Sequence, residues 1–191
     1  TATIEWFKGG LLNVSYNCID RHIENGLGKK DAIIWEGNNS NETLTLSYED
    51  LLNKVSQFAN GLKSIGVEKG DRVCIYMQMI PELAVAMLAC ARIGAVHSIV
   101  FGAFSSDSLK DRINDSQCKI LITQDTGVRG TKTDIPMKEN ADKAVIDCPS
   151  IQNIIVVQRT GSSVNMNSND IWWNDLVKFM SYECAPEKMN A

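Results

Sequence analysis

Histidines and closely spaced cysteines are scarce in this chain. It contains 2 histidines, and its 6 cysteines lie at least sixteen residues apart without forming a C-x-x-C pair. A metal site requires ligands at closer spacing, so we expect none. Free cysteines in apolar segments behave as small hydrophobic residues. We therefore expect buried or half-buried thiols, reduced as is usual in a cytoplasmic compartment, in preference to disulfides.

Long apolar runs and an excess of basic residues are also lacking. No run approaches the roughly 20 residues that cross a bilayer, and no basic-then-apolar leader opens the chain. The 191 residues are 44% hydrophobic and 22% charged, with a net charge of −4. A nucleic-acid-binding surface normally shows clustered Lys and Arg. We therefore expect a cytoplasmic domain with its own core and without nucleic-acid or membrane partners.

The first 70 residues predict a helix, a hairpin and a second helix. The first helix is expected to be capped by Ser15 and ended by Gly26. Two β-branched-rich segments, 32–36 and 43–48, are joined by a polar turn and predict a β-hairpin. A Ser-x-x-Asp capping box then opens an amphipathic helix over 47–66. These elements are expected to pack against whatever follows as one unit.

From residue 72 onward, short apolar strands alternate with amphipathic helices. This rhythm is typical of right-handed βαβ units on a parallel sheet, and the strand over 95–100 is apolar enough to predict burial on both faces. We therefore expect the α/β class, with a mainly parallel sheet and helices on both faces. Residues 1–191 are expected to form one unit, in which 1–70 hold the helices and hairpin, 71–160 the βαβ repeats, and 161–191 a polar loop and a last helix. The expected strands are 72–77, 95–100, 118–123 and 153–157, and the expected helices are 80–93, 105–115, 138–147 and 171–180.

Two loops should meet at one edge of this sheet. One follows the strand over 95–100 and contains Phe101, Gly102 and Ala103; the other is 125–132. Strands of one parallel sheet point the same way, so both loops emerge at the carboxyl edge, where α/β sheets bind ligands. Phe101 could stack on a purine, although a packing role at the edge of the core is the ordinary alternative.

The second loop carries a pair of cations around a flexible turn. Arg129 and Lys132 flank Gly130 and Thr131. A guanidinium, an ammonium and approachable backbone amides suit a phosphate group, and the start of the next helix near Ser105 would add partial positive charge. The ordinary alternative is a solvated surface turn.

The amino-acid sequence resembles that of a known family over nearly its whole length. The segment over 81–105 resembles the acetyl-CoA synthetase branch of the AMP-forming acyl-CoA synthetases, and other segments follow in that family's order. These segments are LNVSYNCIDRH (12–22), AIIWEG (32–37), LKSIGVEKGDRV (62–73), DTGVRG (125–130), VVQRTG (156–161) and IWWNDL (171–176).

This resemblance implies roles for both loops. It implies part of the large N-terminal domain of an adenylate-forming enzyme, with the second loop contacting coenzyme A (CoA) near its 3′-phosphoadenosine end and the first lying beside the adenine. The family usually has glycine where this chain has Ala103 and Thr131. We therefore expect the backbone to approach the adenine less freely at Ala103, and Thr131 either to narrow the phosphate site or to add a hydroxyl donor. The implied CoA-binding residues are Arg129, Gly130, Thr131, Lys132, Phe101, Gly102 and Ala103.

The resemblance also implies an activity that this chain carries only in part. The parent would use Mg²⁺-ATP to convert acetate to an acetyl-adenylate and pyrophosphate, then pass the acetyl group to CoA and release AMP. The family's glycine-rich YTSGSTGKPKG loop does not occur here, and 186–191 resembles the text just before it. We therefore expect an N-terminal fragment with no catalytic residues, inactive alone, whose ATP and Mg²⁺ sites lie in the missing remainder of its chain.

Three other interpretations remain open at this stage. A non-catalytic nucleotide-phosphate-binding α/β module is compatible with these residues, because each of them would bind rather than react. A propionyl-CoA synthetase fragment is equally compatible, because the acyl pocket would lie elsewhere. A dinucleotide-dependent oxidoreductase is disfavoured, because no G-x-G-x-x-G follows any expected strand.

Overall fold

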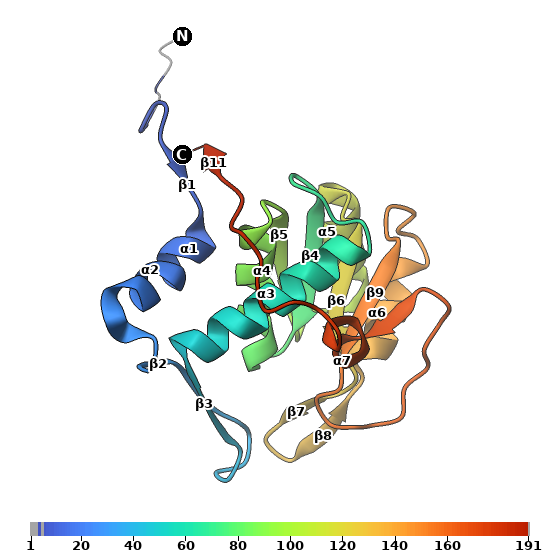
Figure 1. The fold of residues 1–191 in the computed structure, drawn as a ribbon. Coiled ribbons are helices and arrows are strands. Elements are labelled where there is room, and N and C mark those ends of the chain that lie inside the picture. Colours follow the sequence, from blue (N-terminus) through green and yellow to red (C-terminus); the bar gives the residue numbers. More distant parts are fainter. Residues whose placement is uncertain (1–3, 5, 191) are drawn as a thin grey trace.

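Five parallel strands form the central sheet of the molecule (Figure 1). The computed structural model describes residue 4 and residues 6–190. The sheet order is β10-β9-β6-β4-β5, and every neighbouring pair runs parallel. The predicted α/β class is therefore confirmed. The strands are β4 (Arg72–Met77), β5 (Val96–Phe101), β6 (Ile120–Gln124), β9 (Asn153–Val157) and β10 (Asp170–Trp172).

Helices cover both faces of this sheet, as the alternating pattern predicts. Successive residues of β4 point to opposite faces, so Val73 and Ile75 join one hydrophobic cluster while Cys74 and Tyr76 join the other. The first cluster includes residues of α3 (Tyr48–Ser64), α4 (Pro81–Arg92) and α7 (Trp173–Val177), and the second includes residues of α5 (Ser106–Ser116) and α6 (Met137–Val145).

None of the helices in the described part of the chain is long and apolar enough to span a membrane.

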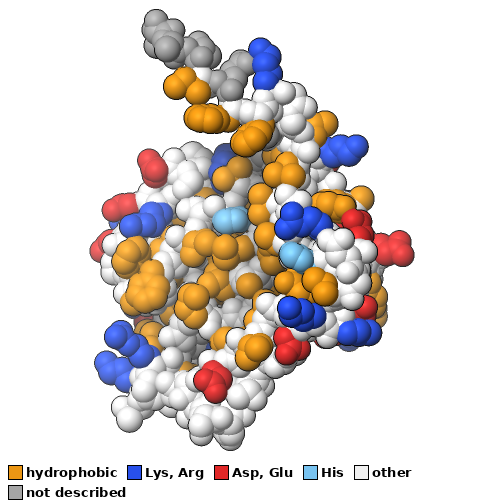
Figure 2. Space-filling model, turned by 90° about the vertical axis from the view of Figure 1, so that its left-hand side faces the viewer, with side chains coloured by type: hydrophobic (Ala, Val, Ile, Leu, Met, Phe, Trp, Pro, Cys, Tyr) orange, Lys and Arg blue, Asp and Glu red, His pale blue; other side chains and the backbone are white. Residues whose placement is uncertain are grey.

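The side chains of β5 are more exposed than predicted, and the strand lies at the edge of the sheet. We expected burial on both faces, yet Val96, Ile99 and Phe101 are 54%, 46% and 60% exposed. Within the described residues β5 pairs with β4 alone. Figure 2 looks onto this side of the molecule and shows hydrophobic side chains gathered at the surface. An apolar run predicts a buried strand only when neighbouring elements are present to cover it.

The N-terminal helix is shorter than predicted and has a different cap. It divides into α1 (Val14–Cys18), α2 (Asp20–His22) and the π-helical turn η1 (Ile23–Leu27). Asn13, rather than Ser15, is the N-cap, and its Oδ1 accepts the Tyr16 N–H at 3.2 Å. Asn13 also donates to the carbonyls of Ala91 and Glu187. This tertiary bonding, which helix propensity does not register, favours Asn13 as the cap and leaves Ser15 buried.

The C-terminal region also departs from prediction. A helix was expected over 171–180, but Asp170–Trp172 adds strand β10 to the exposed edge of β9, and the helix α7 is confined to Trp173–Val177. Further along, β11 (Met189–Asn190) pairs antiparallel with β1 (Leu11–Leu12), so segments near both ends of the chain lie side by side (Figure 1).

All six cysteines are free. Five are buried, whereas Cys18 is exposed, which corrects the expectation that every thiol is at least half-buried. Cys18 ends the short helix α1.

Strands β2 (Asp31–Glu36) and β3 (Thr43–Ser47) form the predicted hairpin, and the predicted capping box follows it. The Ser47 hydroxyl accepts the Asp50 N–H, and the Asp50 carboxylate accepts the Ser47 N–H. Two backbone donors at the start of α3 are thereby satisfied.

We expect Ser47→Ala to lower the free energy of unfolding by about 1 kcal/mol, because an alanine cannot accept the exposed N–H groups of the first turn. Denaturant unfolding of the full-length protein would measure this change. Ser47→Asp, which keeps an acceptor at the cap, is the matched control and should be close to the unsubstituted protein. Equal destabilisation by both substitutions would contradict a capping role.

Candidate functional site

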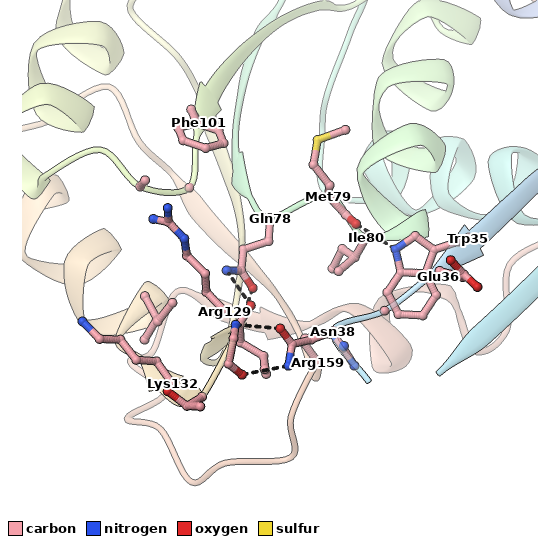
Figure 3. A pocket seen from close by; sticks show the side chains of 17 residues that line it. Trp35, Glu36, Asn38, Gln78, Met79, Ile80, Phe101, Arg129, Lys132 and Arg159 are labelled. Atoms are coloured by element: carbon pink, nitrogen blue, oxygen red, sulfur yellow. Dashed lines mark hydrogen bonds between the residues drawn. The ribbon is translucent and has the colours of Figure 1, made fainter. Parts of the chain in front are cut away.

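A cavity of about 910 Å³ opens at the carboxyl edge of the central sheet (Figure 3). The two segments predicted to converge there do so. Every predicted site residue lines this one cavity: Phe101, Gly102, Ala103, Arg129, Gly130, Thr131 and Lys132.

The first wall is the turn that follows β5. Phe101 is the last residue of β5, and its ring packs edge-to-face on Phe104 with 6.2 Å between ring centroids. At 60% exposure, the ring keeps much of its surface free for a ligand. The turn lies tightly against β4, because a Cβ added at Gly102 would be 3.0 Å from the Met77 carbonyl oxygen. A larger residue at this position would therefore push the wall into the cavity.

The second wall is a β-hairpin where the sequence predicted a loop. Strands β7 (Gly127–Arg129) and β8 (Lys132–Ile135) pair antiparallel, with Arg129 opposite Lys132. Gly130, at a φ of +58°, begins the two-residue turn between them, where glycine is favoured because that region is costly for other residues. The loop interpretation failed because a strand of three residues carries too little periodicity to be recognised.

This arrangement places both cations on the cavity. Figure 3 shows the Arg129 side chain extending toward the turn after Phe101, while Lys132 extends from the neighbouring strand. Both side chains are exposed, and within the described residues neither forms a salt bridge. Two uncompensated cations beside an open aromatic ring can bind an anionic group attached to a planar ring.

One prediction about this turn is wrong. We expected its backbone amides to be open to a ligand, but the Gly130 N–H already donates to Asn38 Oδ1 at 2.7 Å. The Asn38 amide in turn donates to the Gly130 carbonyl at 2.9 Å. A ligand therefore meets the Arg129 and Lys132 side chains rather than this amide.

Two glutamine side chains hold the base of the hairpin. Gln78 Oε1 accepts the Val128 N–H at 2.9 Å, and its Nε2 donates to the Val128 carbonyl at 3.3 Å, so this side chain pairs with β7 as a strand would. Gln124 Oε1 accepts the Gln78 N–H at 2.9 Å, and its Nε2 donates to the Thr126 carbonyl at 2.9 Å. The hairpin is thereby tied to the ends of β4 and β6.

A buried carboxylate ties the hairpin to the next loop. Asp125 is fully buried and directly precedes the hairpin. Its carboxylate oxygens accept the backbone N–H groups of Thr126, Arg159, Thr160 and Gly161 at 2.7 to 3.1 Å. This set of donors satisfies a buried anion without a cation, and it fixes the loop after β9 against the start of β7.

The β2–β3 hairpin supplies a third wall, which the sequence did not predict. Trp35 Nε1 donates to the Met79 carbonyl at 2.8 Å. Arg159 lies over the Trp35 ring, 5.2 Å from its centroid, and bonds Glu42 at 2.7 Å. The hydrogen bond from Arg159 holds the pKa of Glu42 below its ordinary value. Arg159 is thus engaged by this wall, in contrast to Arg129 and Lys132.

Some of the missed lining residues had a recognisable signal in the sequence. Gln78 and Arg159 follow β4 and β9, so the rule that loops after parallel strands share one edge could have identified them. Trp35 and Asn38 had none, because only the tertiary fold places their hairpin beside this edge.

His97 is half-buried in β5 and does not line the cavity. Burial lowers the pKa of its imidazole below the ordinary value. The described residues that line the cavity include no histidine, cysteine or serine. The lining offers cations, amides, aromatic rings and the carboxylate of Glu36.

Comparison with known proteins identifies relatives along nearly the whole chain. The model of a family described as AMP-binding enzyme matches residues 20–187. The chain is 54% identical over 188 residues to the acetyl-coenzyme A synthetase of Rubrobacter xylanophilus, and 56% identical over 187 residues to acetyl-coenzyme A synthetase 2 of Pseudomonas aeruginosa. These matches cover 98% and 97% of this chain but 29% of each relative.

A third relative extends the match to the whole chain. Acetyl-coenzyme A synthetase 2 of Pseudomonas putida is 50% identical over 192 residues, which cover 100% of this chain and 30% of that protein. The chain therefore spans less than a third of the length of the curated relatives it matches. Because the family model covers most of the chain and these identities extend along all of it, the chain belongs to the AMP-binding enzyme family.

Proposed function

We propose that this chain is the N-terminal part of an acetate–CoA ligase and that its cavity binds the 3′-phosphoadenosine end of CoA. The observation that carries the proposal is the convergence of Phe101, Arg129 and Lys132 on one cavity. The names of the relatives, acetyl-coenzyme A synthetase, support the choice of ligand and reaction.

In this proposal the first wall binds the adenine and the second binds the 3′-phosphate. The adenine stacks on Phe101 at the end of β5, where its ring is exposed. Arg129 and Lys132 donate charge-assisted hydrogen bonds to the 3′-phosphate, the stronger class of hydrogen bond. None of these contacts involves the thiol of CoA or the acyl group. They therefore stabilise bound substrate and transition state equally, which lowers the KM for CoA without raising kcat.

The rest of the reaction belongs to the remainder of the parent chain. There, ATP and Mg²⁺ would convert acetate to an acetyl-adenylate with release of pyrophosphate, and the CoA thiol would then displace AMP. In this proposal residues 1–191 form a single unit of the adenylation domain and carry no catalytic residue. The parent acts on small molecules in the cytoplasm.

The reaction is tested by product analysis of the full-length protein. With acetate, ATP, Mg²⁺ and CoA, we expect acetyl-CoA, AMP and pyrophosphate in equal amounts. A larger kcat/KM with propionate than with acetate would assign the parent to propionyl-CoA synthesis instead, and the absence of any acyl-CoA product would refute the proposal.

The ligand of the cavity is tested by removing one phosphate from CoA. We expect 3′-dephospho-CoA to show a KM about 10- to 100-fold above that of CoA, because a hydrogen bond to a charged group contributes ~1.5–3 kcal/mol. The acetate-dependent exchange of pyrophosphate into ATP, which needs no CoA, is the internal control. Equal KM values for the two thiols would show that the 3′-phosphate is not bound here.

A further inference from the structure

The tip of the β7–β8 hairpin is held from outside by a single side chain. The Asn38 amide accepts the N–H of Gly130 at 2.7 Å and donates to the carbonyl of the same residue at 2.9 Å (Figure 3). The two residues are 92 positions apart in the chain. Asn38 therefore bonds both polar groups of one peptide residue, as a neighbouring β-strand would.

The residue held in this way determines where the two cations point. Gly130 lies between Arg129 and Lys132 and has a φ of +58°. A change in its position would move the Cα atoms on both sides of the turn. The pair of bonds from Asn38 thus restrains the part of the hairpin on which the proposed phosphate contacts depend.

The hairpin needs such restraint, because it is small and isolated. Strands β7 and β8 have three and four residues and form a two-stranded sheet of their own in the described part of the chain. An isolated two-stranded hairpin is marginally stable in water. Gln78 and Gln124 hold its base, whereas Asn38 contacts its tip.

Asn38 can serve as a support, because its own hairpin is anchored at two further points. Trp35 in β2 donates to the Met79 carbonyl beyond the end of β4, and Glu42 bonds Arg159 beyond the end of β9. The turn that carries Asn38 is therefore tied to the same sheet edge as the turn that it holds.

We propose that Asn38 is a positioning residue for CoA binding, acting through Arg129 by fixing the turn over 129–132. This inference rests on the proposed function of the cavity. Asn38 also lines the cavity, but its amide is engaged with Gly130, so its effect on the ligand is exerted through the turn. Loss of this support lets the hairpin tip sample positions in which the guanidinium no longer meets the phosphate.

The inference is tested by a double-mutant cycle in the full-length protein. We expect Asn38→Ala to raise the KM for CoA about 3- to 10-fold, with kcat and pyrophosphate exchange unchanged. In an Arg129→Ala background the same substitution should change the KM by less than twofold, because the group being positioned is gone. Asn39→Ala is the matched control in the same turn; the Asn39 backbone carbonyl accepts the Glu42 N–H, and that bond survives the substitution.

The outcomes separate this inference from the proposed function. A KM increase from Asn38→Ala that is equally large in both backgrounds would overturn the action through Arg129. No increase from Asn38→Ala, while Arg129→Ala does raise the KM, would overturn the role of Asn38 and leave the CoA site intact. No effect of Arg129→Ala would overturn both. If Asn38→Ala abolishes pyrophosphate exchange through misfolding, the cycle is run with Asn38→Gln, which keeps an uncharged amide beside the turn and should show a smaller but likewise non-additive increase.

Discussion

Replacing Arg129 with alanine in the full-length protein is expected to raise the KM for CoA by about 10- to 100-fold. The guanidinium lies on the cavity without a salt-bridge partner among the described residues, so its donors are available to a phosphate. A hydrogen bond to a charged group is worth ~1.5–3 kcal/mol, and each ~1.4 kcal/mol corresponds to a tenfold change in affinity. Steady-state kinetics at saturating acetate and ATP would measure the effect.

The first half-reaction provides the check on this prediction. Acetate-dependent exchange of pyrophosphate into ATP should survive in Arg129→Ala, because acetyl-adenylate forms before CoA is needed. Arg21→Ala, which removes an exposed guanidinium from α2, is the matched control and should leave the KM for CoA unchanged. Loss of exchange with unaltered dependence on CoA would refute the role assigned to Arg129.

Replacing Arg92 with methionine is expected to lower the free energy of unfolding by about 3–5 kcal/mol, as is typical when one partner of a buried ion pair is removed. Arg92 is 4% exposed and donates two 2.8 Å hydrogen bonds to Asp20, whose side chain is 15% exposed. Its Nε also donates to the Cys184 carbonyl. The substitution leaves the Asp20 carboxylate without its cation and removes the bond from the Arg92 side chain to the C-terminal segment. Urea unfolding of the full-length protein would measure the loss.

Two further variants distinguish a buried ion pair from a simple loss of packing. Replacing both partners, with Arg92→Met and Asp20→Leu together, should recover part of the lost stability, because no uncompensated charge is then buried. Lys143→Met breaks the exposed pair of Lys143 with Glu139 and should change stability little. If the double variant were no more stable than Arg92→Met alone, the lost stability would not come from an uncompensated charge on Asp20.

The regular part of the fold was predictable, because its signals are local. The alternation of apolar strands and amphipathic helices from residue 72 placed β4 and β9 at their observed bounds, and it placed α4, β5, α5, β6 and α6 within two residues. The Ser47 capping box was also recognised from four adjacent residues. Such features depend on residues close in sequence, whose periodicity survives in any tertiary context.

The incorrect predictions concern features that depend on residues distant in the sequence. Asn13 replaces Ser15 as the N-cap because Asn13 also bonds carbonyls in distant segments. Asp170–Trp172 forms a strand because β9 offers it an unpaired edge. Side chains on both faces of β5 are exposed at the end of the sheet, where among the described residues the strand pairs with β4 alone. Each outcome depends on which neighbours are present, and a window of a few residues does not contain them.

The same division applies to the candidate site. Residue patterns alone established the α/β class, the resemblance to the AMP-forming synthetases, and the two segments that meet at the sheet edge, since the carboxyl ends of parallel strands must share that edge. Only the tertiary structure decided that 127–135 is a hairpin, that the Gly130 amide is occupied, and that Trp35 and Asn38 belong to the cavity. The reason is physical: a hydrogen bond across 92 residues follows from the packing of two hairpins on one sheet, and no sequence period encodes it.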